Sequence, residues 1–457
     1  MNNETAPFIV ANHNGVFTEP PKRVPSPKGV DGPLLGNGDV GVVLSGEAEA
    51  QTFWIGKIDF WSRVLYIPLP VGGVTVHIPE LTGADYHQEQ DLLHAEVRGR
   101  FQKEGVVVET RSWTAATRNL LVTEIRNGSG ESLDVTVDLW TNQARLKEYP
   151  VGLMPDERRK VLAYREAREY PTCAGTEGDL LWIKRHAEPR DVEGMDAVMV
   201  TKVVGVRAAV GSDDKSKATA SLRLAPGRTV YLVTAVLTNR DVAPGDPLET
   251  AKHEALERDP DELDELNREH REWWREFWSA SFIEIADKKV EAFWYGAQYI
   301  LACCNRAGMV APGLWGNWIT TDRSRWNGDY TLNYNFQAPY FGVFSSNHPE
   351  LAEPYFDAVL DFMPQGRKMA QEHCCRGIHY PTHFGPYGLY DKRHYGQRSN
   401  AAYCALHFID RYYYTCDLDF LRNKSYPFLI ELADFWEDYL EKDERGRYVV
   451  YRSNAHE

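Results

Sequence analysis

The sequence predicts an antiparallel β-sandwich that is followed, across a helical linker, by an all-helical domain. Three observations support this fold class. Between Val71 and Thr238, several runs alternate apolar and polar residues with a period of two, and turns rich in Gly, Asn and Ser separate them. Prolines and a glycine at Ala243–Pro247 then end the strand pattern. From Val290 onward, apolar residues recur at three- and four-residue spacing, which is typical of helices.

We therefore expect a β-sandwich domain over residues 1–245, a helical linker over 246–285 and a helical domain over 286–457. The strands expected from the alternation are 74–78, 92–101, 106–113, 120–127, 133–140, 198–210 and 229–239. The segment Thr141–Glu177 is charged and punctuated by prolines, so it is interpreted as an irregular excursion beside the sandwich.

A glycine-rich motif near the N-terminus invites a dinucleotide-binding interpretation. Gly36, Gly38 and Gly41 spell GxGxxG within PLLGNGDVGVVLSG. That fingerprint needs a strand before it and a helix after it. Here Pro33 stands just upstream, and the residues that follow are β-branched. We therefore predict a glycine-rich turn between two strands, and no nucleotide cofactor.

The linker and the second domain read as helical. The acidic run Asp259–Glu262 starts a helix within the charged stretch Leu248–Phe277, and the aromatic residues of HREWWREFW form an apolar stripe that docks two domains. Five helices are expected in the second domain, at about 290–305, 336–345, 349–372, 399–415 and 418–442.

Composition limits the possible partners. The 457 residues are 43% hydrophobic and carry a net charge of −15 without a Lys/Arg cluster, which argues against nucleic acid or a membrane surface and favours a neutral substrate. No apolar run approaches the roughly 20 residues of a membrane span, and the start lacks the features of a signal peptide, so we expect a cytoplasmic protein. The cysteines lack zinc-site spacing and are expected to be reduced and structural, without a metal: Cys173, Cys303, Cys304, Cys374, Cys375, Cys404 and Cys416.

Candidate functional residues concentrate in Gly313–Tyr340, a long stretch with little periodicity, which indicates a functional loop. It holds three tryptophans and two alternate asparagines: Trp315, Trp318, Trp326, Asn333 and Asn335. Aromatic faces combined with amides suit a pyranose, which has an apolar face and a rim of hydroxyls. An extended segment would point both asparagines to one side, into one pocket with a tryptophan. The alternative is that the aromatic residues simply fill a core.

The segment YTLNYN, residues 330–335, resembles glycoside hydrolase family 95, the α-L-fucosidases and relatives of the six-hairpin glycosidase group. The preceding GLWGNW and SRWNGDYTLNYN stand in the family's order, and PLLGNGDVG with FWIGKIDFWS is similar to the family's opening. The resemblance implies that Asn333 and Asn335 position and activate the attacking water. This chain continues with FQAPYFG where the family has a TEMNYWP-like segment, which puts the substrate sugar in doubt.

The resemblance also implies the rest of the catalytic region. It implies the first part of an (α/α)6 toroid and a general acid after a strand, here Arg447–Asn454, which makes Glu457 the general acid. His379 and His383, in GIHYPTHFGPYG, are candidates for the sugar pocket with Asp329. The activating carboxylate would lie beyond the chain, and Asp322 or Asp329 is the alternative base.

The expected function is therefore inverting hydrolysis of an α-glycosidic bond, in an α-L-fucoside or related sugar, with an oligosaccharide or glycoside as substrate. One alternative is a non-catalytic carbohydrate-binding protein or a truncated, inactive hydrolase. A phosphorylase is a further alternative, which would need a phosphate site rich in Ser, Lys or Arg that the sequence does not display.

Overall fold

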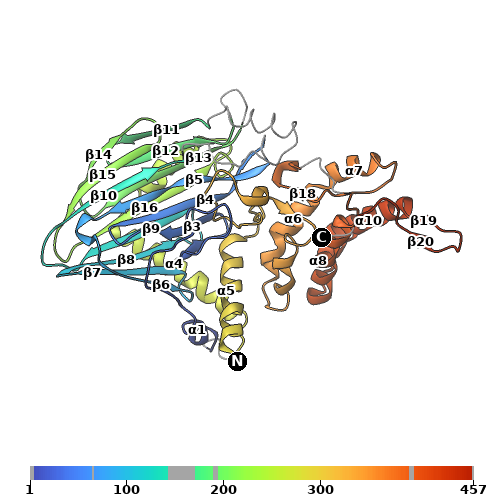
Figure 1. Ribbon diagram of the computed structural model, residues 1–457, viewed down its shortest axis with the longest axis horizontal. Helices are drawn as coiled ribbons and strands as arrows, with labels where there is room; N and C mark the ends of the chain where they lie inside the picture. The colour runs from blue at the N-terminus through green and yellow to red at the C-terminus, as the bar shows by residue number, and fades with distance from the viewer. Residues whose placement is uncertain (1–4, 64–65, 143–169, 189–193, 391–395, 455–457) are drawn as a thin grey trace.

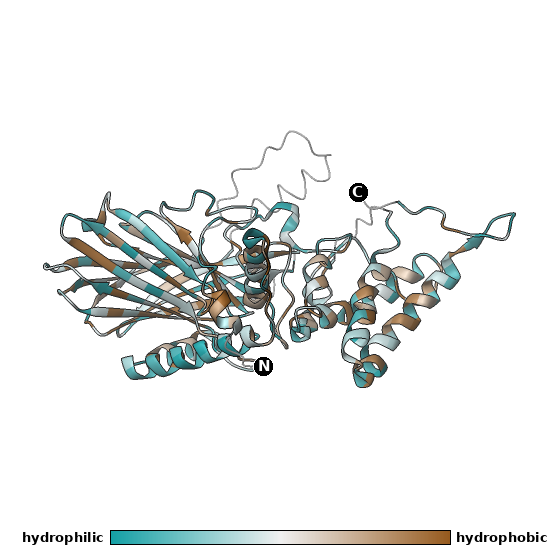
Figure 2. Cartoon of the chain, turned by 90° about the horizontal axis from the view of Figure 1, so that it is seen from below, coloured by the Kyte–Doolittle hydropathy of each residue, from teal (hydrophilic) through white to brown (hydrophobic). Residues whose placement is uncertain are grey.

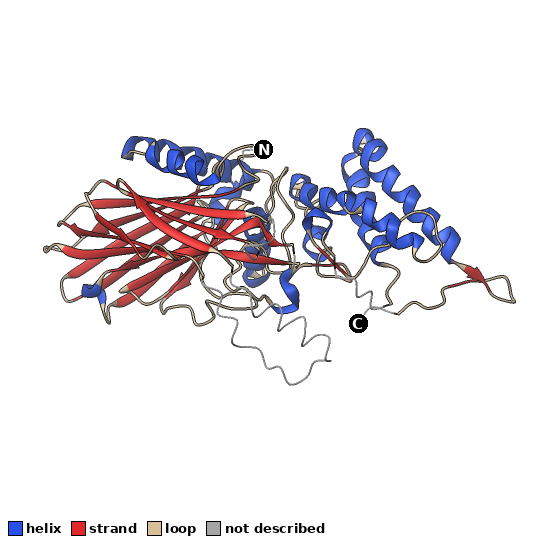
Figure 3. Cartoon of the chain, turned by 90° about the horizontal axis from the view of Figure 1, so that it is seen from above, coloured by secondary structure: helices blue, strands red, loops and turns tan. Residues whose placement is uncertain are grey.

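The computed structural model describes residues 5–63, 66–142, 170–188, 194–390 and 396–454. The sandwich forms one end of the molecule and has several helices beside it, α5 (Lys288–Cys304) stands at the junction, and the remaining helices form the other end (Figures 1 and 3). Among the described residues, no helix has both the length and the hydropathy needed to cross a membrane.

Two antiparallel sheets form the sandwich, with nine and seven strands within the described residues. The first sheet runs in the order β1 (Gly15–Phe17), β6 (Asp85–Asp91), β7 (Glu96–Lys103), β8 (Val106–Thr114), β9 (Leu120–Asn127), β16 (Thr229–Thr238), β13 (Asp196–Val204), β12 (Leu180–His186) and β11 (Thr172–Glu177). The second runs in the order β14 (Ala209–Ser212), β15 (Lys217–Leu224), β10 (Leu133–Trp140), β5 (Ile67–His77), β4 (Ala50–Ser62), β3 (Val40–Ser45) and β2 (Leu34–Gly36).

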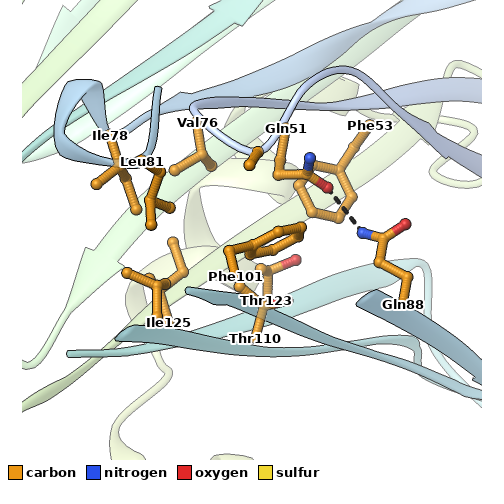
Figure 4. Close-up of a pocket in the computed structure, with 12 residues that line it drawn as sticks. Gln51, Phe53, Val76, Ile78, Leu81, Gln88, Phe101, Thr110, Thr123 and Ile125 are labelled. Carbon is orange, nitrogen blue, oxygen red and sulfur yellow. Dashed lines mark hydrogen bonds between the residues drawn. The ribbon is translucent and has the colours of Figure 1, made fainter. Parts of the chain in front are cut away.

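The core between the sheets follows from the alternation in the sequence. In β10, every second side chain from Leu133 to Leu139 is buried, and the residues between them are not. Each fully buried Val or Leu stabilises the fold by about 1.5–3 kcal/mol relative to exposure. Packing leaves only a small void of about 10 Å³ between the sheets, where Gln88 Nε2 donates to Gln51 Oε1 at 2.7 Å (Figure 4). The predicted β-sandwich is confirmed.

Two details of the sandwich bear on the sequence interpretation. The glycine motif is a turn between β2 and β3, as predicted, with Gly38 at φ 88° and the Asn37 side chain accepting hydrogen bonds from two amides of the turn. The segment Thr141–Glu177 is not irregular throughout, because Thr172–Glu177 is strand β11, which pairs with β12 across a turn at Gly178. Residues 143–169 lie outside the described residues.

The linker consists of two helices, α3 (Pro247–Leu256) and α4 (Pro260–Ser279), because a proline separates them. Asp259 and Glu262 form a capping box at the start of α4. Helix α3 packs on β13 and β16, while the buried end of α4 reaches the sandwich, where Trp278 Nε1 donates to the Leu92 carbonyl at 3.0 Å. Hydrophilic residues predominate over most of α4 (Figure 2). The predicted docking of an aromatic stripe is confirmed.

The helical region contains, besides α5, the helices α6 (Glu353–Asp361), α7 (Met363–Gln371), α8 (Asn400–Thr415), α9 (Leu418–Phe420) and α10 (Tyr426–Tyr439), and α1 (Thr5–Val10) stands at the N-terminus. Short helical turns are η1 (Pro79–Leu81), η3 (Arg325–Gly328), η4 (Ala338–Gly342), η5 (Pro349–Ala352), η6 (Pro386–Gly388) and η7 (Leu421–Ser425). Two-stranded pairs are β17 (Tyr330–Thr331) with β18 (His383–Phe384), and β19 (Glu441–Lys442) with β20 (Tyr448–Val449).

Five expected elements differ from the observed ones. The single strand expected over 198–210 is divided into β13 and β14, which belong to different sheets. The helix expected over 336–345 is only the turn η4. The one expected over 349–372 breaks at Phe362, because Pro364 has no N–H to continue the helical ladder. The one expected over 418–442 contains the π-helical turn η7. Of the strand expected over 447–454, only the two residues of β20 are a strand. Among the described residues, β20 pairs only with β19, which is itself two residues long.

A buried charge cluster lies at the edge of the sandwich. The Nζ atom of Lys57 is 2.6 Å from Asp39 Oδ1, 3.2 Å from Asp59 Oδ1 and 3.1 Å from Asp241 Oδ2. The Lys57 side chain is 1% exposed. Asn119 Nδ2 donates to Asp39 Oδ2 at 2.8 Å. One ammonium group thus faces three carboxylates in a site largely closed to water.

This cluster predicts a pH-dependent contribution to stability. Burial raises the pKa of Asp39 from 3.8 to about 6, and the charges of Asp59 and Asp241 add to the shift, whereas Lys57 opposes it. The native state therefore holds a proton between pH 4 and 6 that the unfolded chain releases, so the contribution of Asp39 to stability falls as the pH rises through this interval.

We expect the free energy of unfolding of the wild type, relative to Asp39→Asn, to fall by on the order of 1–3 kcal/mol between about pH 4 and pH 6.5. Urea unfolding of both proteins at the two pH values measures the difference. A difference that is the same at both pH values would contradict the assignment.

Candidate active site

Two loops that are far apart in the sequence meet in a two-stranded ribbon. Strand β17 pairs with β18 in antiparallel register, with Tyr330 opposite Phe384 and Thr331 opposite His383. Side chains alternate along each strand, so Thr331 and His383 share one face and the two aromatic residues share the other. The ribbon therefore brings the loop Gly313–Tyr340 together with the loop that carries His383.

A buried carboxylate and an imidazole form the polar centre of this face. His383 Nδ1 lies 3.0 Å from Asp329 Oδ1, and Thr331 Oγ1 donates to the same oxygen at 3.3 Å. Asp329 is 2% exposed. Burial raises the pKa of Asp329, while the hydrogen bond and the charge of His383 oppose the shift. An ionised Asp329 accepts a hydrogen bond from Nδ1–H, which fixes the tautomer and orientation of the imidazole.

A cavity of about 50 Å³ lies beside this pair. Its polar lining comes from Asp329, Thr331 and Asn335, and apolar residues form the rest of its wall: Pro312, Gly313, Leu314, Phe336, Pro339 and Tyr340. A water molecule occupies about 30 Å³ of liquid, so this space suits water rather than a whole sugar ring. The Asn335 amide thus shares a small polar chamber with a buried carboxylate.

Asn333 occupies a different environment. Its Oδ1 atom is buried and has no hydrogen-bond partner among the described residues. Buried polar atoms of this kind are rare in native proteins and recur at functional sites. The amide oxygen can therefore accept a hydrogen bond from a buried water molecule.

The expected geometry of the asparagine pair is wrong. Residues 332–337 form turns instead of an extended segment, with the amide of Phe336 donating to the Thr331 carbonyl and that of Gln337 to the Tyr334 carbonyl. As a result, Asn335 lines the cavity and Asn333 does not, and none of its described lining residues is a tryptophan. This cavity therefore does not bring both amides together with a tryptophan.

The three tryptophans separate into two environments. Trp318 is 7% exposed and its Nε1 donates to the Leu35 carbonyl at 2.9 Å, so it fills the core, as the alternative interpretation held. Trp315 and Trp326 instead stack, with centroids 6.3 Å apart and planes at 9°, and Trp326 is 61% exposed. Of these three tryptophans, Trp315 and Trp326 are therefore the two that present aromatic surface to a ligand.

The remaining predicted residues also separate. His379 is 1% exposed, its Nε2 lies 3.2 Å from the Gln397 carbonyl oxygen, and its ring stacks on Phe435, so it belongs to the core and its expected place in the sugar pocket is wrong. Glu457 lies outside the described residues. Within those residues, no group of three or more His, Cys, Asp or Glu side chains is arranged to hold a metal ion.

The sandwich contributes a residue that sequence reasoning missed. The Trp61 ring, at the end of β4, contacts Tyr330 edge to face at 5.6 Å. A Cβ atom at Gly313 would lie 3.4 Å from this ring, and one at Gly385 would lie 3.3 Å from it. Trp61 therefore supports the backbone on both sides of the ribbon. Its only sequence signal was its place in FWIGKIDFWS, which suggests no role.

A second sandwich residue anchors the long loop. Arg185 is fully buried, and its Nη2 donates to Asp322 Oδ1 at 2.6 Å. Asp322 is thus engaged in an ion pair and is not placed to act as a base.

Removing this carboxylate should be costly. We expect Asp322→Ala to lower the free energy of unfolding by about 3–5 kcal/mol, because it leaves the Arg185 guanidinium buried without a counter-charge. Urea unfolding measures the loss. The control is Asp134→Ala, since Asp134 and its partner Arg223 are both 72% exposed and 3.8 Å apart, and a loss within about 1 kcal/mol is expected there. Equal losses in the two variants would refute the anchoring role.

Comparison with known proteins agrees with the resemblance seen in the sequence. Residues 271–457 match the model of the glycosyl hydrolase family 95 catalytic domain. The chain is 30% identical over 190 residues to a protein of Aspergillus niger named "Probable alpha-fucosidase A", an alignment that covers 39% of this chain and 24% of that protein. It is 29% identical over 160 residues to "Alpha-L-fucosidase 2" of Arabidopsis thaliana, covering 34% and 19%. The chain therefore spans a quarter or less of these relatives.

The fold is also shared with a solved structure, the "Putative kojibiose phosphorylase from human microbiome". The TM-score is 0.61 at 11% sequence identity, and the match covers 92% of this chain and 59% of that chain. A likeness at this identity concerns the fold alone. It confirms the predicted fold class, a β-sandwich, a helical linker and part of an (α/α)6 toroid.

Proposed function

From the family 95 match of residues 271–457, we propose that the protein is a glycoside hydrolase that cleaves an α-glycosidic bond with inversion, in an α-L-fucoside or related sugar. The observation that supports this best is the chamber lined by Asn335, Thr331 and Asp329, whose carboxylate is hydrogen-bonded to His383. The names of the two curated relatives support the choice of sugar. The substrate is an oligosaccharide or glycoside.

Each residue has a role in this proposal. Inversion requires an acid that protonates the leaving oxygen and an activated water on the opposite face of the sugar. Asn335 holds the water in the chamber. The family resemblance also gives Asn333 a part in positioning the water, although Asn333 is not one of the residues that line the chamber. Asp329 holds His383 toward the sugar hydroxyls. Glu457 supplies the proton, as the family resemblance implies.

Stereochemistry tests the proposal. The full-length natural protein is incubated with an aryl α-L-fucoside, and NMR identifies the first-formed anomer of the free sugar. We expect the β-anomer, because no carboxylate is proposed to attack the anomeric carbon and a water does so directly. Net retention would overturn the mechanism.

Unchanged products on addition of inorganic phosphate are expected for a hydrolase, whereas a sugar 1-phosphate would indicate a phosphorylase.

The role of Glu457 is tested in the same assay. Glu457→Gln is expected to lower the rate by about 10²–10⁴-fold. The matched control is Glu444→Gln, which changes an exposed carboxylate nearby in the sequence and should leave the rate unchanged.

A non-catalytic carbohydrate-binding protein is the second candidate, and the exposed Trp315–Trp326 pair favours it. Binding of a glycoside without any turnover by the full-length protein would support this candidate over the hydrolase.

A further inference from the structure

A second and larger cavity lies on the other face of the β17–β18 ribbon. Its volume is about 210 Å³, and Tyr330, which points away from Thr331 and His383, forms part of its wall. Four segments that are distant in the sequence build the rest: the turn after β16, the loop after α5, helix α6, and residues 385–388 after β18. It is therefore separated from the candidate active site by the ribbon itself.

Both polar and apolar groups line the cavity, and the polar ones predominate. Asp357 and Asp361 lie one helical turn apart on α6, so their carboxylates share one face of the helix. Arg240 approaches from the sandwich. The apolar part of the wall includes Met309, Pro354, Phe362 and Pro386. Convergent charged groups beside an apolar wall can orient a ligand and also contact its apolar part.

The side of the cavity formed by Arg240 is held in place. Its guanidinium carbon lies 5.2 Å from the centre of the Tyr387 ring, a cation–π contact. The Tyr387 hydroxyl donates to the Asp59 carbonyl at 3.2 Å, which ties the ring to the buried charge cluster of the sandwich. Tyr387 also adopts φ 63°, a left-handed conformation that is unfavourable for a bulky residue and persists only where the surroundings impose it.

The charges around the cavity nearly balance. Lys424 Nζ lies 2.8 Å from Asp357 Oδ1 and offsets that carboxylate, and Arg240 offsets Asp361 across the cavity. The carboxylates can only accept hydrogen bonds, and the guanidinium can only donate them. A ligand that bonds to all of these groups therefore needs both hydrogen-bond donors and acceptors. Hydroxyl groups meet this condition. The near-neutral surroundings favour a ligand without net charge.

We propose that this cavity is a second binding site, separate from the candidate active site, for a neutral polyhydroxylated molecule of monosaccharide size. The apolar wall of Phe362 and Pro386 faces the apolar side of a sugar ring, while Asp357, Asp361 and Arg240 bind its hydroxyls. The volume is too small for an oligosaccharide to enter whole. This assignment does not depend on the hydrolytic activity.

Hydrogen exchange of the full-length protein tests the assignment, with L-fucose, D-galactose and myo-inositol as probes at millimolar concentration. At least one probe should slow exchange in peptides that cover residues 306–311 and 385–390. Asp361→Asn, at an exposed position that folding tolerates, should weaken the binding that causes this protection by about tenfold or more. Asp419→Asn, a carboxylate that is 87% exposed on α9, should leave it unchanged.

A second pair of variants separates the two sites. Ala358→Phe, which fills the cavity from α6, should abolish the protection, whereas Asp329→Asn in the candidate active site should retain it. The assignment is overturned if no probe slows exchange in these peptides, if protection is confined to residues 329–340, or if Asp361→Asn binds as tightly as the wild type. If Asp329→Asn loses hydrolysis but keeps the ligand-induced protection from exchange, the second site binds its ligand independently of the candidate active site.

Discussion

Replacing Asn335 by alanine in the full-length enzyme is expected to lower kcat by about 10²–10⁴-fold with little change in KM. The Asn335 amide lines a chamber of about 50 Å³ together with the buried Asp329 carboxylate, a space that suits a water molecule. A group that orients the attacking water acts mainly in the transition state, so its loss lowers kcat and kcat/KM alike. Steady-state kinetics with an aryl α-L-fucoside measures both parameters.

Two comparisons make this result specific. Asn333→Ala should also lower kcat, because the variant removes the buried Oδ1 atom that has no partner among the described residues. Asn423→Ala, at an exposed position in η7, should behave like the wild type. If Asn335→Ala retains the wild-type kcat, the water-positioning role is wrong. A rise in KM alone would make Asn335 a substrate-binding residue instead.

Lys57→Met is expected to destabilise the fold by about 3–5 kcal/mol, the usual effect of leaving buried charge without its partner. The substitution keeps most of the side-chain volume but leaves Asp39, Asp59 and Asp241 facing one another without the ammonium group. Urea unfolding at pH 7 measures the loss of stability. At this pH each of the three carboxylates must either stay charged in the buried site or take up a proton, and both cost free energy.

The matched control is Lys217→Met. Lys217 lies 3.4 Å from Asp138 and its side chain is 49% exposed, so a loss within about 1 kcal/mol is expected. Adding Asp39→Asn to Lys57→Met should recover part of the stability, because it removes one of the unpaired carboxylates. A Lys57→Met variant as stable as the control would show that the cluster is not stabilised by its lysine.

Much of the fold follows from short-range patterns in the chain. The alternation of LDVTVDLW is enough to predict β10 and its buried face, because the side-chain period of a strand is a local property. The acidic cap at Asp259 and the apolar spacing of α5 and α8 likewise predict where these helices lie. The motif YTLNYN carries a resemblance to family 95, and the model of that family's catalytic domain matches residues 271–457.

The arrangement of the candidate site depended instead on which distant segments come together. Whether Trp318 faces a sugar or fills a core is decided by the sandwich carbonyl that it contacts, 283 residues away. Trp61 reaches the ribbon, and Arg185 reaches the long loop, from strands whose own patterns show only burial. Such contacts are set by tertiary packing, which overrides local preference and has no signature in the spacing of either segment.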